Sequence, residues 1–269
     1  TEAGGFKFDY SYDGYELDTV KFPHDKNEDY ISKIDELVSK KAAECISNKG
    51  PDLSWMYLWY TDSMGHKFGD SDTFYQSIEL ADKQVGRVWE AVKQRRKKFN
   101  EDWMIVITTD HGRKSSDGKG HGGQTDRERS IWIVTNHPDT NLYFKSNPGI
   151  VDIAPSVLRH MEIEMPQDLK NEMDGTPLIG GVSVSELRAS KMGSQIHITC
   201  QSFGERGPAT VFMSTSNQFK SGGADVYTEV LSVKYIDEKA SFEPTEPNLP
   251  FYKIVLVTPE NTINAWVVD

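Results

Sequence analysis

Apolar positions recur every three or four residues in two long stretches of the first hundred residues. The first stretch covers residues 27–48 and its apolar positions are Tyr30, Ile31, Ile34, Leu37, Val38, Ala42, Cys45 and Ile46. The second begins near Ser71 and continues through Phe74, Ile78, Ala81, Val85, Val88, Trp89 and Val92. This spacing places the apolar side chains on one face and predicts two amphipathic helices, the first ended by Gly50-Pro51.

Three shorter runs are nearly continuously apolar, as is typical of strands buried on both faces. They cover residues 54–60, 103–109 and 130–135, and a short helical pattern follows at 152–161. Strands that alternate with helices favour an α/β fold. We therefore expect a mostly parallel sheet with helices on both faces.

The pattern changes after Gly180-Gly181. Strand-like runs at 195–200, 209–213, 227–233 and 251–257 are separated by clusters of Gly, Pro, Ser and Asn, and no long helical pattern remains. We predict two domains, an α/β domain over residues 1–181 and an all-β sandwich of immunoglobulin or fibronectin size over residues 182–269.

Composition narrows the class of partner. The formal net charge of −11 over 269 residues argues against a nucleic-acid polymer, which needs basic stripes on its partner, but not against a small phosphorylated substrate. No apolar run approaches the roughly 20 residues that a bilayer span requires. The two cysteines, Cys45 and Cys200, lie far apart and indicate no disulfide framework.

Candidate metal ligands follow the predicted strands. Asp62 and His66 are four residues apart just after the first run, Asp110 and His111 follow the second, and His121 lies in the Gly-rich loop 118–123. Carboxylate oxygen and imidazole nitrogen are ligands that suit Zn²⁺ and similar cations. Alone, the first pair fits a capping or solvated role equally well, and each of the other two groups fits a structural or solvated role better. Their shared place at the carboxyl edge of the sheet, where α/β folds bind ligands, favours a metal site.

In combination the motifs Asp62-x-x-Gly-His66, Thr-Asp110-His111-Gly and Gly-His121-Gly resemble the alkaline-phosphatase superfamily, and most closely its nucleotide pyrophosphatase/phosphodiesterase branch. Val151-Asp-Ile-Ala-Pro-Ser-Val-Leu and Met173-Asp-Gly-Thr-Pro-Leu178 are similar to the segment that closes that catalytic domain. The resemblance implies a metal-dependent hydrolase of phosphoric esters with two divalent ions, zinc before manganese. Asp62, His66 and His121 would hold one ion, and Asp110 and His111 would supply half of the second site.

The resemblance also implies an earlier segment with a further aspartate and the Thr or Ser nucleophile, and no such segment is visible before Asp62. We therefore expect this chain to correspond to the C-terminal portion of a longer enzyme. Its partners would be that missing N-terminal segment and a phosphorylated small molecule, and its location extracytoplasmic. The alternative is a non-catalytic surface-binding protein that uses the β-sandwich on an inactive scaffold. Two basic residues, Arg113 and Lys119, lie near the candidate ligands in the sequence. We expect their side chains to be exposed.

Overall fold

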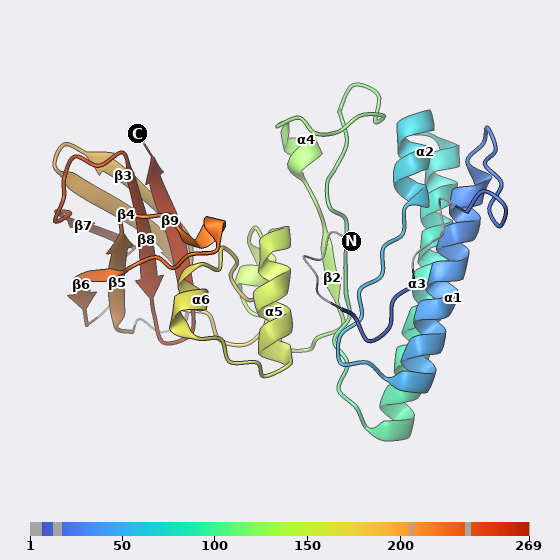
Figure 1. The fold of residues 1–269 in the computed structure, drawn as a ribbon, viewed down its shortest axis with the longest axis horizontal. Coiled ribbons are helices and arrows are strands. Elements are labelled where there is room, and N and C mark those ends of the chain that lie inside the picture. The colour runs from blue at the N-terminus through green and yellow to red at the C-terminus, as the bar shows by residue number, and fades with distance from the viewer. Residues whose placement is uncertain (1–6, 13–17, 205–206, 235–237, 269) are drawn as a thin grey trace. The chain divides into compact units, whose positions relative to one another are not determined.

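The structure is a computed structural model that describes residues 7–12, 18–204, 207–234 and 238–268. It divides into two compact units, residues 1–103 with 111–130 and residues 104–110 with 131–269 (Figure 1). No helix in the described ranges is long and apolar enough to cross a membrane.

The first unit is built on three helices, α1 (Asp29–Lys49), α2 (Tyr60–Phe68) and α3 (Asp72–Phe99), with the short α4 (Asp126–Arg129). Helices α1 and α3 pack along each other, and Arg87 of α3 donates to Glu36 and Ser39 of α1 at 2.7 and 2.5 Å. The side chains buried between the helices include Ile31, Ile34, Ile46, Met64, Ala91 and Val92. The two long helices predicted from apolar periodicity are thus confirmed.

The prediction of a buried strand at residues 54–60 is wrong. Residues 54–59 form neither helix nor strand, and α2 begins at Tyr60. The side chains of Leu53, Trp55 and Tyr57 are 64%, 90% and 58% exposed, so this apolar run is not buried. The cause of the helix start lies elsewhere in the chain. The buried Asp35 carboxylate accepts the backbone N–H groups of Trp59 and Tyr60, which satisfies donors that begin α2.

The second unit begins with a two-stranded sheet of β1 (Val106–Thr108) and β2 (Ile133–Thr135). The 3₁₀ segments η1 (Tyr143–Lys145) and η2 (Ile150–Asp152) and the helices α5 (Ile153–His160) and α6 (Gln167–Asn171) follow. The predicted parallel sheet is not found in the described part of the chain, because β1 and β2 pair antiparallel. Residues 111–130 leave β1 as a loop that belongs to the other unit, and the chain then returns beside β1 in the opposite direction.

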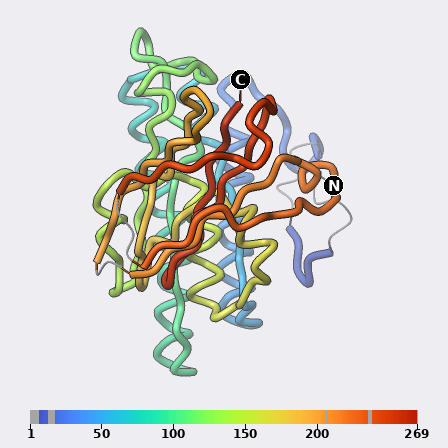
Figure 2. The backbone as a smooth tube through the Cα atoms, turned by 90° about the vertical axis from the view of Figure 1, so that its left-hand side faces the viewer, coloured from blue at the N-terminus to red at the C-terminus, as the bar shows by residue number. Residues whose placement is uncertain are grey.

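The C-terminal part of this unit is rich in strands, as predicted. One sheet has the order β3-β4-β7, with β3 (Val184–Met192), β4 (Gln195–Ser202) and β7 (Lys239–Phe242). The other has the order β6-β5-β8-β9, with β5 (Ala209–Ser214), β6 (Thr228–Val233), β8 (Phe251–Val257) and β9 (Thr262–Val268) (Figures 1 and 2). The 3₁₀ segment η3 (Phe219–Ser221) lies between β5 and β6.

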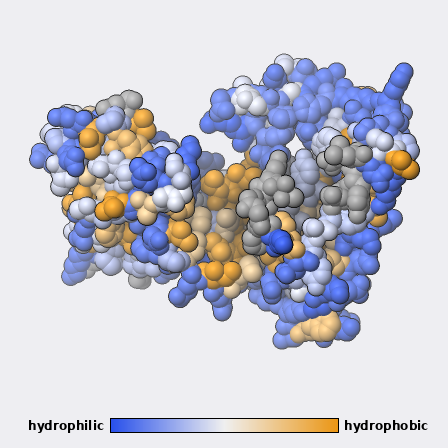
Figure 3. All heavy atoms as spheres, viewed as in Figure 1, coloured by the Kyte–Doolittle hydropathy of each residue, from blue (hydrophilic) through white to orange (hydrophobic). Residues whose placement is uncertain are grey.

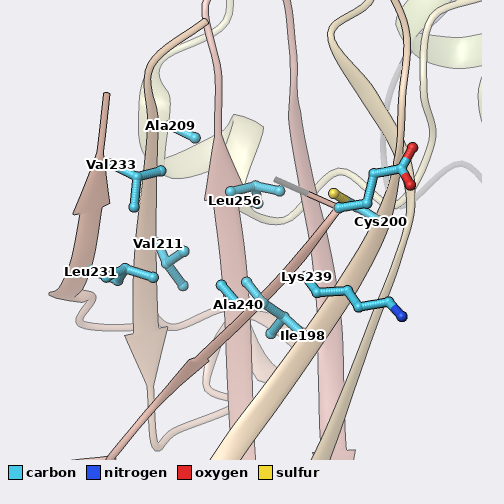
Figure 4. Close-up of a pocket in the computed structure, with 10 residues that line it drawn as sticks. Ile198, Cys200, Ala209, Val211, Leu231, Val233, Lys239, Ala240 and Leu256 are labelled. Atoms are coloured by element: carbon cyan, nitrogen blue, oxygen red, sulfur yellow. The ribbon is translucent and has the colours of Figure 1, made fainter. Parts of the chain in front are cut away.

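A single hydrophobic core joins the two sheets of this part. It includes Val184 and Ile196 of one sheet with Val211, Ile254 and Leu256 of the other, all at most 2% exposed. Between the sheets lies a cavity of about 80 Å³ whose lining is mostly aliphatic (Figure 4). Burial raises the pKa of the Cys200 thiol in this lining to about 11, so that the thiol stays protonated at neutral pH. The immunoglobulin or fibronectin type of the module stays a prediction.

Candidate metal centre

Helix α2 carries two of the candidate ligands. Asp62 and His66 are four residues apart and therefore project from the same face, with His66 Nε2 3.5 Å from Asp62 Oδ1. Their side chains are 28% and 49% exposed, which leaves room for a ligand from solvent. The apolar pattern predicted that this pair directly follows a strand. The helix achieves the same convergence through its 3.6-residue period.

The loop between β1 and α4 brings two further imidazoles to this face of α2. His121 Nε2 lies 2.9 Å from His66 Nε2 and 3.8 Å from Asp62 Oδ1. The rings of His111 and His121 stack with their centroids 3.7 Å apart. His111 Nδ1 lies 2.9 Å from the Gly112 carbonyl oxygen, which as an acceptor fixes the proton on Nδ1 and leaves Nε2 with its lone pair for a metal.

Backbone contacts hold this loop in place. Lys114 N–H donates to the Gly120 carbonyl at 2.8 Å, directly before His121, and Gly112 N–H donates to the Glu128 carbonyl at 2.8 Å. Gly112 also passes so close to the Arg127 carbonyl that a side chain at this position would collide with the backbone. The motif glycine is therefore required by packing of the loop on α4.

Arg113 joins the helix to the loop, although the sequence predicted an exposed side chain. Its guanidinium Nη2 donates to both the backbone carbonyl and Oδ1 of Asp62, at 2.8 and 2.6 Å. Its Nη1 points to the carbonyls of Gly118 and Lys119 at 3.5 and 3.3 Å. The side chain is only 10% exposed, so that it orients Asp62 and the His121 loop rather than meeting a substrate.

Gly65 makes room for this guanidinium. A Cβ at Gly65 would collide with the Arg113 guanidinium. The Phe74 ring also packs on this guanidinium, with its centroid 5.5 Å from Arg113 Cζ. A glycine in the middle of a helix costs roughly 1 kcal/mol relative to alanine and so calls for a packing reason. That cost was the signal in the sequence that could have pointed to a buried partner of α2.

Electrostatics favour the neutral, metal-binding form of His121. Burial lowers the pKa of this imidazole, and the neighbouring His111 and His66 lower it further, against the opposing effect of Asp62. A neutral imidazole offers the lone pair that a cation needs.

The donor set fits a divalent cation. One carboxylate oxygen of Asp62 and one ring nitrogen each of His111 and His121 all lie within 4.8 Å of one another. Metal–ligand distances of 2.0–2.1 Å place the atoms of a tetrahedral zinc site about 3.3 Å apart, and the separations of 2.9, 3.5 and 3.8 Å that involve Asp62, His66 and His121 bracket that value.

Comparison with known families identifies the family of this chain. Residues 5–171 match the model of the type I phosphodiesterase/nucleotide pyrophosphatase family, which is well over half of the chain and includes all five candidate ligands. The chain belongs to this family. It is thereby a member of the alkaline-phosphatase superfamily, as the motifs indicated, and members of this superfamily use divalent metals.

Relatives of this phosphodiesterase-family chain include 2,3-bisphosphoglycerate-independent phosphoglycerate mutases. The protein from Campylobacter jejuni subsp. doylei is 26% identical over 137 residues, which cover 46% of this chain and 24% of that protein. The protein from Yersinia pestis is 33% identical over 124 residues, which cover 44% of this chain and 21% of that protein. The chain thus spans about a quarter of the length of these relatives.

One solved structure, the pectate lyase Pel3 from Pectobacterium carotovorum, aligns with a TM-score of 0.23 and 15% identity over 30% of this chain and 24% of that chain. This similarity is too low to support any assignment.

The family resemblance assigns His111 to a second ion together with Asp110. In the structure His111 stacks on His121 and joins Asp62 in one group of ligand atoms. Asp110 ends the segment 104–110, which belongs to the other compact unit. Its pairing with His111 at a second ion stays a prediction. Lys119 is exposed, as expected.

Proposed function

We propose that this chain holds a divalent cation through Asp62, His66, His121 and His111 and acts in metal-dependent hydrolysis of a phosphodiester or pyrophosphate. The observation that carries the proposal is the convergence of three imidazoles and one carboxylate from two segments of the chain about 50 residues apart. An accidental surface cluster has no reason to bring nitrogen and oxygen atoms to the spacing of a metal site. Membership of the phosphodiesterase family supports the same chemistry.

The candidate ligands and Arg113 would have different roles in this reaction. A bound divalent cation supplies positive charge for the phosphoryl oxygens and lowers the pKa of a coordinated hydroxyl group. Asp62 and the histidines would hold that cation at a solvent-accessible surface, where a phosphorylated substrate can reach it. Arg113 would fix the orientation of Asp62 and remove part of its negative charge. We propose zinc before manganese, because imidazole-rich tetrahedral sets favour zinc.

A second candidate is phosphoryl transfer between two hydroxyl groups of one substrate. The curated relatives are phosphoglycerate mutases, and the coarser class that covers both candidates is a phosphoryl-transfer enzyme. A candidate of another class is a surface-binding protein in which the β-rich part binds a partner and the metal site is vestigial. Such a protein would not need the ligands in binding geometry.

Metal content tests the proposal directly. The purified chain is stripped with a chelator, reloaded with zinc or manganese, and its bound metal measured by elemental analysis. We expect about one ion per chain, and a loss of at least tenfold in affinity in His121→Ala and His66→Ala. His197→Ala is the matched control, because that half-buried histidine of β4 belongs to the other compact unit, where it pairs with Ser241. No metal in the wild type, or equal loss in the control, would contradict the site.

Activity then separates the candidates. The metal-loaded chain is assayed with bis(p-nitrophenyl) phosphate, with p-nitrophenyl phosphate, and for conversion of 3-phosphoglycerate to 2-phosphoglycerate. The hydrolase proposal predicts the highest kcat/KM for the diester in the longest form of the protein that can be prepared. Mutase turnover without hydrolysis would favour the second candidate. Metal binding with no turnover on any of the three would favour the surface-binding candidate.

A further inference from the structure

The C-terminal end of α3 carries a dense cluster of positive charge. Five of the six residues at positions 93–98 are Lys or Arg, in a chain whose formal net charge is −11. Basic residues in the last turn of a helix are favourable because they face the negative end of the helix dipole, and this explains one or two of them. The remaining charge needs another reason.

Two of the five cations form ion pairs with neighbouring carboxylates. Lys93 pairs with Glu90, and Arg95 holds Glu101 with two hydrogen bonds from its guanidinium. The other three, Arg96, Lys97 and Lys98, are exposed, and the ion pairs found among the described residues at this helix end involve only Lys93 and Arg95. The end of α3 therefore presents a surplus of three positive charges to solvent.

An exposed aromatic ring lies among these charges. Phe99 is 48% exposed, and its ring has the Arg95 guanidinium 4.1 Å and the Lys98 ammonium 4.8 Å from its centroid. Arg95 is itself held in place, because its guanidinium packs against Gly50, where a side chain would collide with it. In Figure 3 the lower end of the helical unit shows an apolar spot bordered by hydrophilic surface.

A surface hollow lies on another face of the same helix end. It is lined by Lys93, Arg96, Lys97, Asn100 and Glu101, so that two unpaired cations, Arg96 and Lys97, and the paired Lys93 border one open space. Glu101 is already bound by Arg95, and its charge does not cancel theirs. The hollow can accept an anionic group such as a phosphate, and the exposed ring at the same helix end can enter an apolar layer.

We propose that this end of α3, residues 93–100, is a docking surface for an anionic phospholipid membrane. Lipid phosphates would occupy the hollow between the cations, and Phe99 would enter the boundary between headgroups and acyl chains. The charge surplus and the exposed ring together favour a membrane over a duplex nucleic acid, which offers phosphates but no apolar layer. The acidic remainder of the chain would also repel a long polyanion.

Vesicle co-sedimentation tests the proposal with the full chain. The fraction of protein bound is compared between vesicles of phosphatidylcholine alone and vesicles in which about three in ten lipids are phosphatidylglycerol. Each basic residue near an anionic surface contributes about fivefold to partitioning, so the triple variant R96Q/K97Q/K98Q is expected to bind the anionic vesicles about 100-fold more weakly. F99A is expected to lose a few-fold, and to do so equally at low and high salt, because its contribution is apolar.

The matched control is K33Q/K40Q/K41Q, which removes the same charge from exposed positions on α1. It is expected to keep at least a third of the wild-type partitioning, and circular dichroism checks that all variants are folded. Equal partitioning into both kinds of vesicle, equal loss in the control, or binding to a 20-base-pair duplex DNA in place of vesicles would overturn the proposal. The candidate metal ligands lie outside residues 93–100. If the chain proved to bind no metal, the vesicle measurements would still test the docking surface.

Discussion

At the scale of single residues, the close approach of Gly65 to the Arg113 guanidinium fixes how α2 packs against the loop that carries His121. A methyl group at Gly65 would have to displace the buried guanidinium, whereas a Cβ at Gly86 in α3 would meet nothing within 4 Å. We predict that Gly65→Ala lowers the free energy of unfolding by about 1–3 kcal/mol through overpacking. Gly86→Ala, the matched control, is predicted to raise it by about 0.5–1 kcal/mol. Urea unfolding followed by circular dichroism measures both, and a stabilising Gly65→Ala would contradict the packing argument.

Removal of the Arg113 guanidinium tests whether this group positions Asp62 and the loop before His121. Arg113→Ala leaves the Asp62 carboxylate and two loop carbonyls without their donor, and charged hydrogen bonds of this kind contribute on the order of 2 kcal/mol to the free energy of unfolding. We predict a loss of about that size together with weaker zinc binding by calorimetry. Arg129→Ala serves as control, because its pair with Asp126 is exposed and should contribute under about 0.5 kcal/mol. Unchanged zinc affinity in Arg113→Ala would show that the guanidinium does not position the ligands.

At the scale of elements, local patterns identified the helices whose apolar faces repeat over many turns, as in α1 and α3. They failed at α2, because the apolar run before it satisfies the strand pattern while the cause of the helix start lies 24 residues upstream. Asp35 reaches Trp59 and Tyr60 only once α1 is folded, and no window of neighbouring residues contains that contact. The ligand types and motifs could likewise be read from the chain, whereas the burial of Arg113 follows from tertiary packing.

The same Asp35 gives α2 a dependence on pH. Burial raises the pKa of this carboxyl from 3.8 to about 6, against the two backbone N–H groups that lower it. The folded state therefore binds the proton more tightly than the unfolded state, and the contribution of Asp35 to stability is fully present below about pH 4 and is lost as pH rises through 6. We predict that the free energy of unfolding of the wild type, relative to Asp35→Asn, increases by on the order of 3 kcal/mol from pH 7 to pH 4. Urea unfolding at four pH values measures this.

A difference between wild type and Asp35→Asn that does not change with pH would contradict the Asp35 prediction. Asp52→Asn, an exposed carboxylate in the segment before α2, is the charge-matched control. Its difference from the wild type should stay within about 0.5 kcal/mol over the same range, as is usual for surface substitutions.

At the scale of the whole molecule, the strand-rich part is joined to the segment before it by buried charge. Lys253 of β8 is 2% exposed and pairs with Glu172, which follows α6 and also accepts the Tyr227 hydroxyl at 2.6 Å. The Asn264 amide adds hydrogen bonds to the carbonyls of Asn171 and Met173 at 3.3 and 3.1 Å. Residues 131–181 and the strands thus lie in one compact unit, although the composition of the chain changes near residue 181.

This buried pair should control how firmly α6 is held. Lys253→Met leaves the Glu172 carboxylate buried without its cation, and breaking a buried pair in this way costs about 3–5 kcal/mol. The Asp225 carboxylate, which is fully buried, also lies 3.7 Å from Lys253. The triple variant K253M/E172Q/D225N removes all three charges and keeps an acceptor for Tyr227, so we predict that it recovers at least half of that loss. Hydrogen exchange by mass spectrometry should show faster exchange over residues 167–173 in Lys253→Met, with α1 unchanged. If the triple variant is as unstable as the single one and exchange near α6 does not change, the strands depend on Lys253 for packing alone, and the attachment of α6 must then rest on the Asn264 contacts.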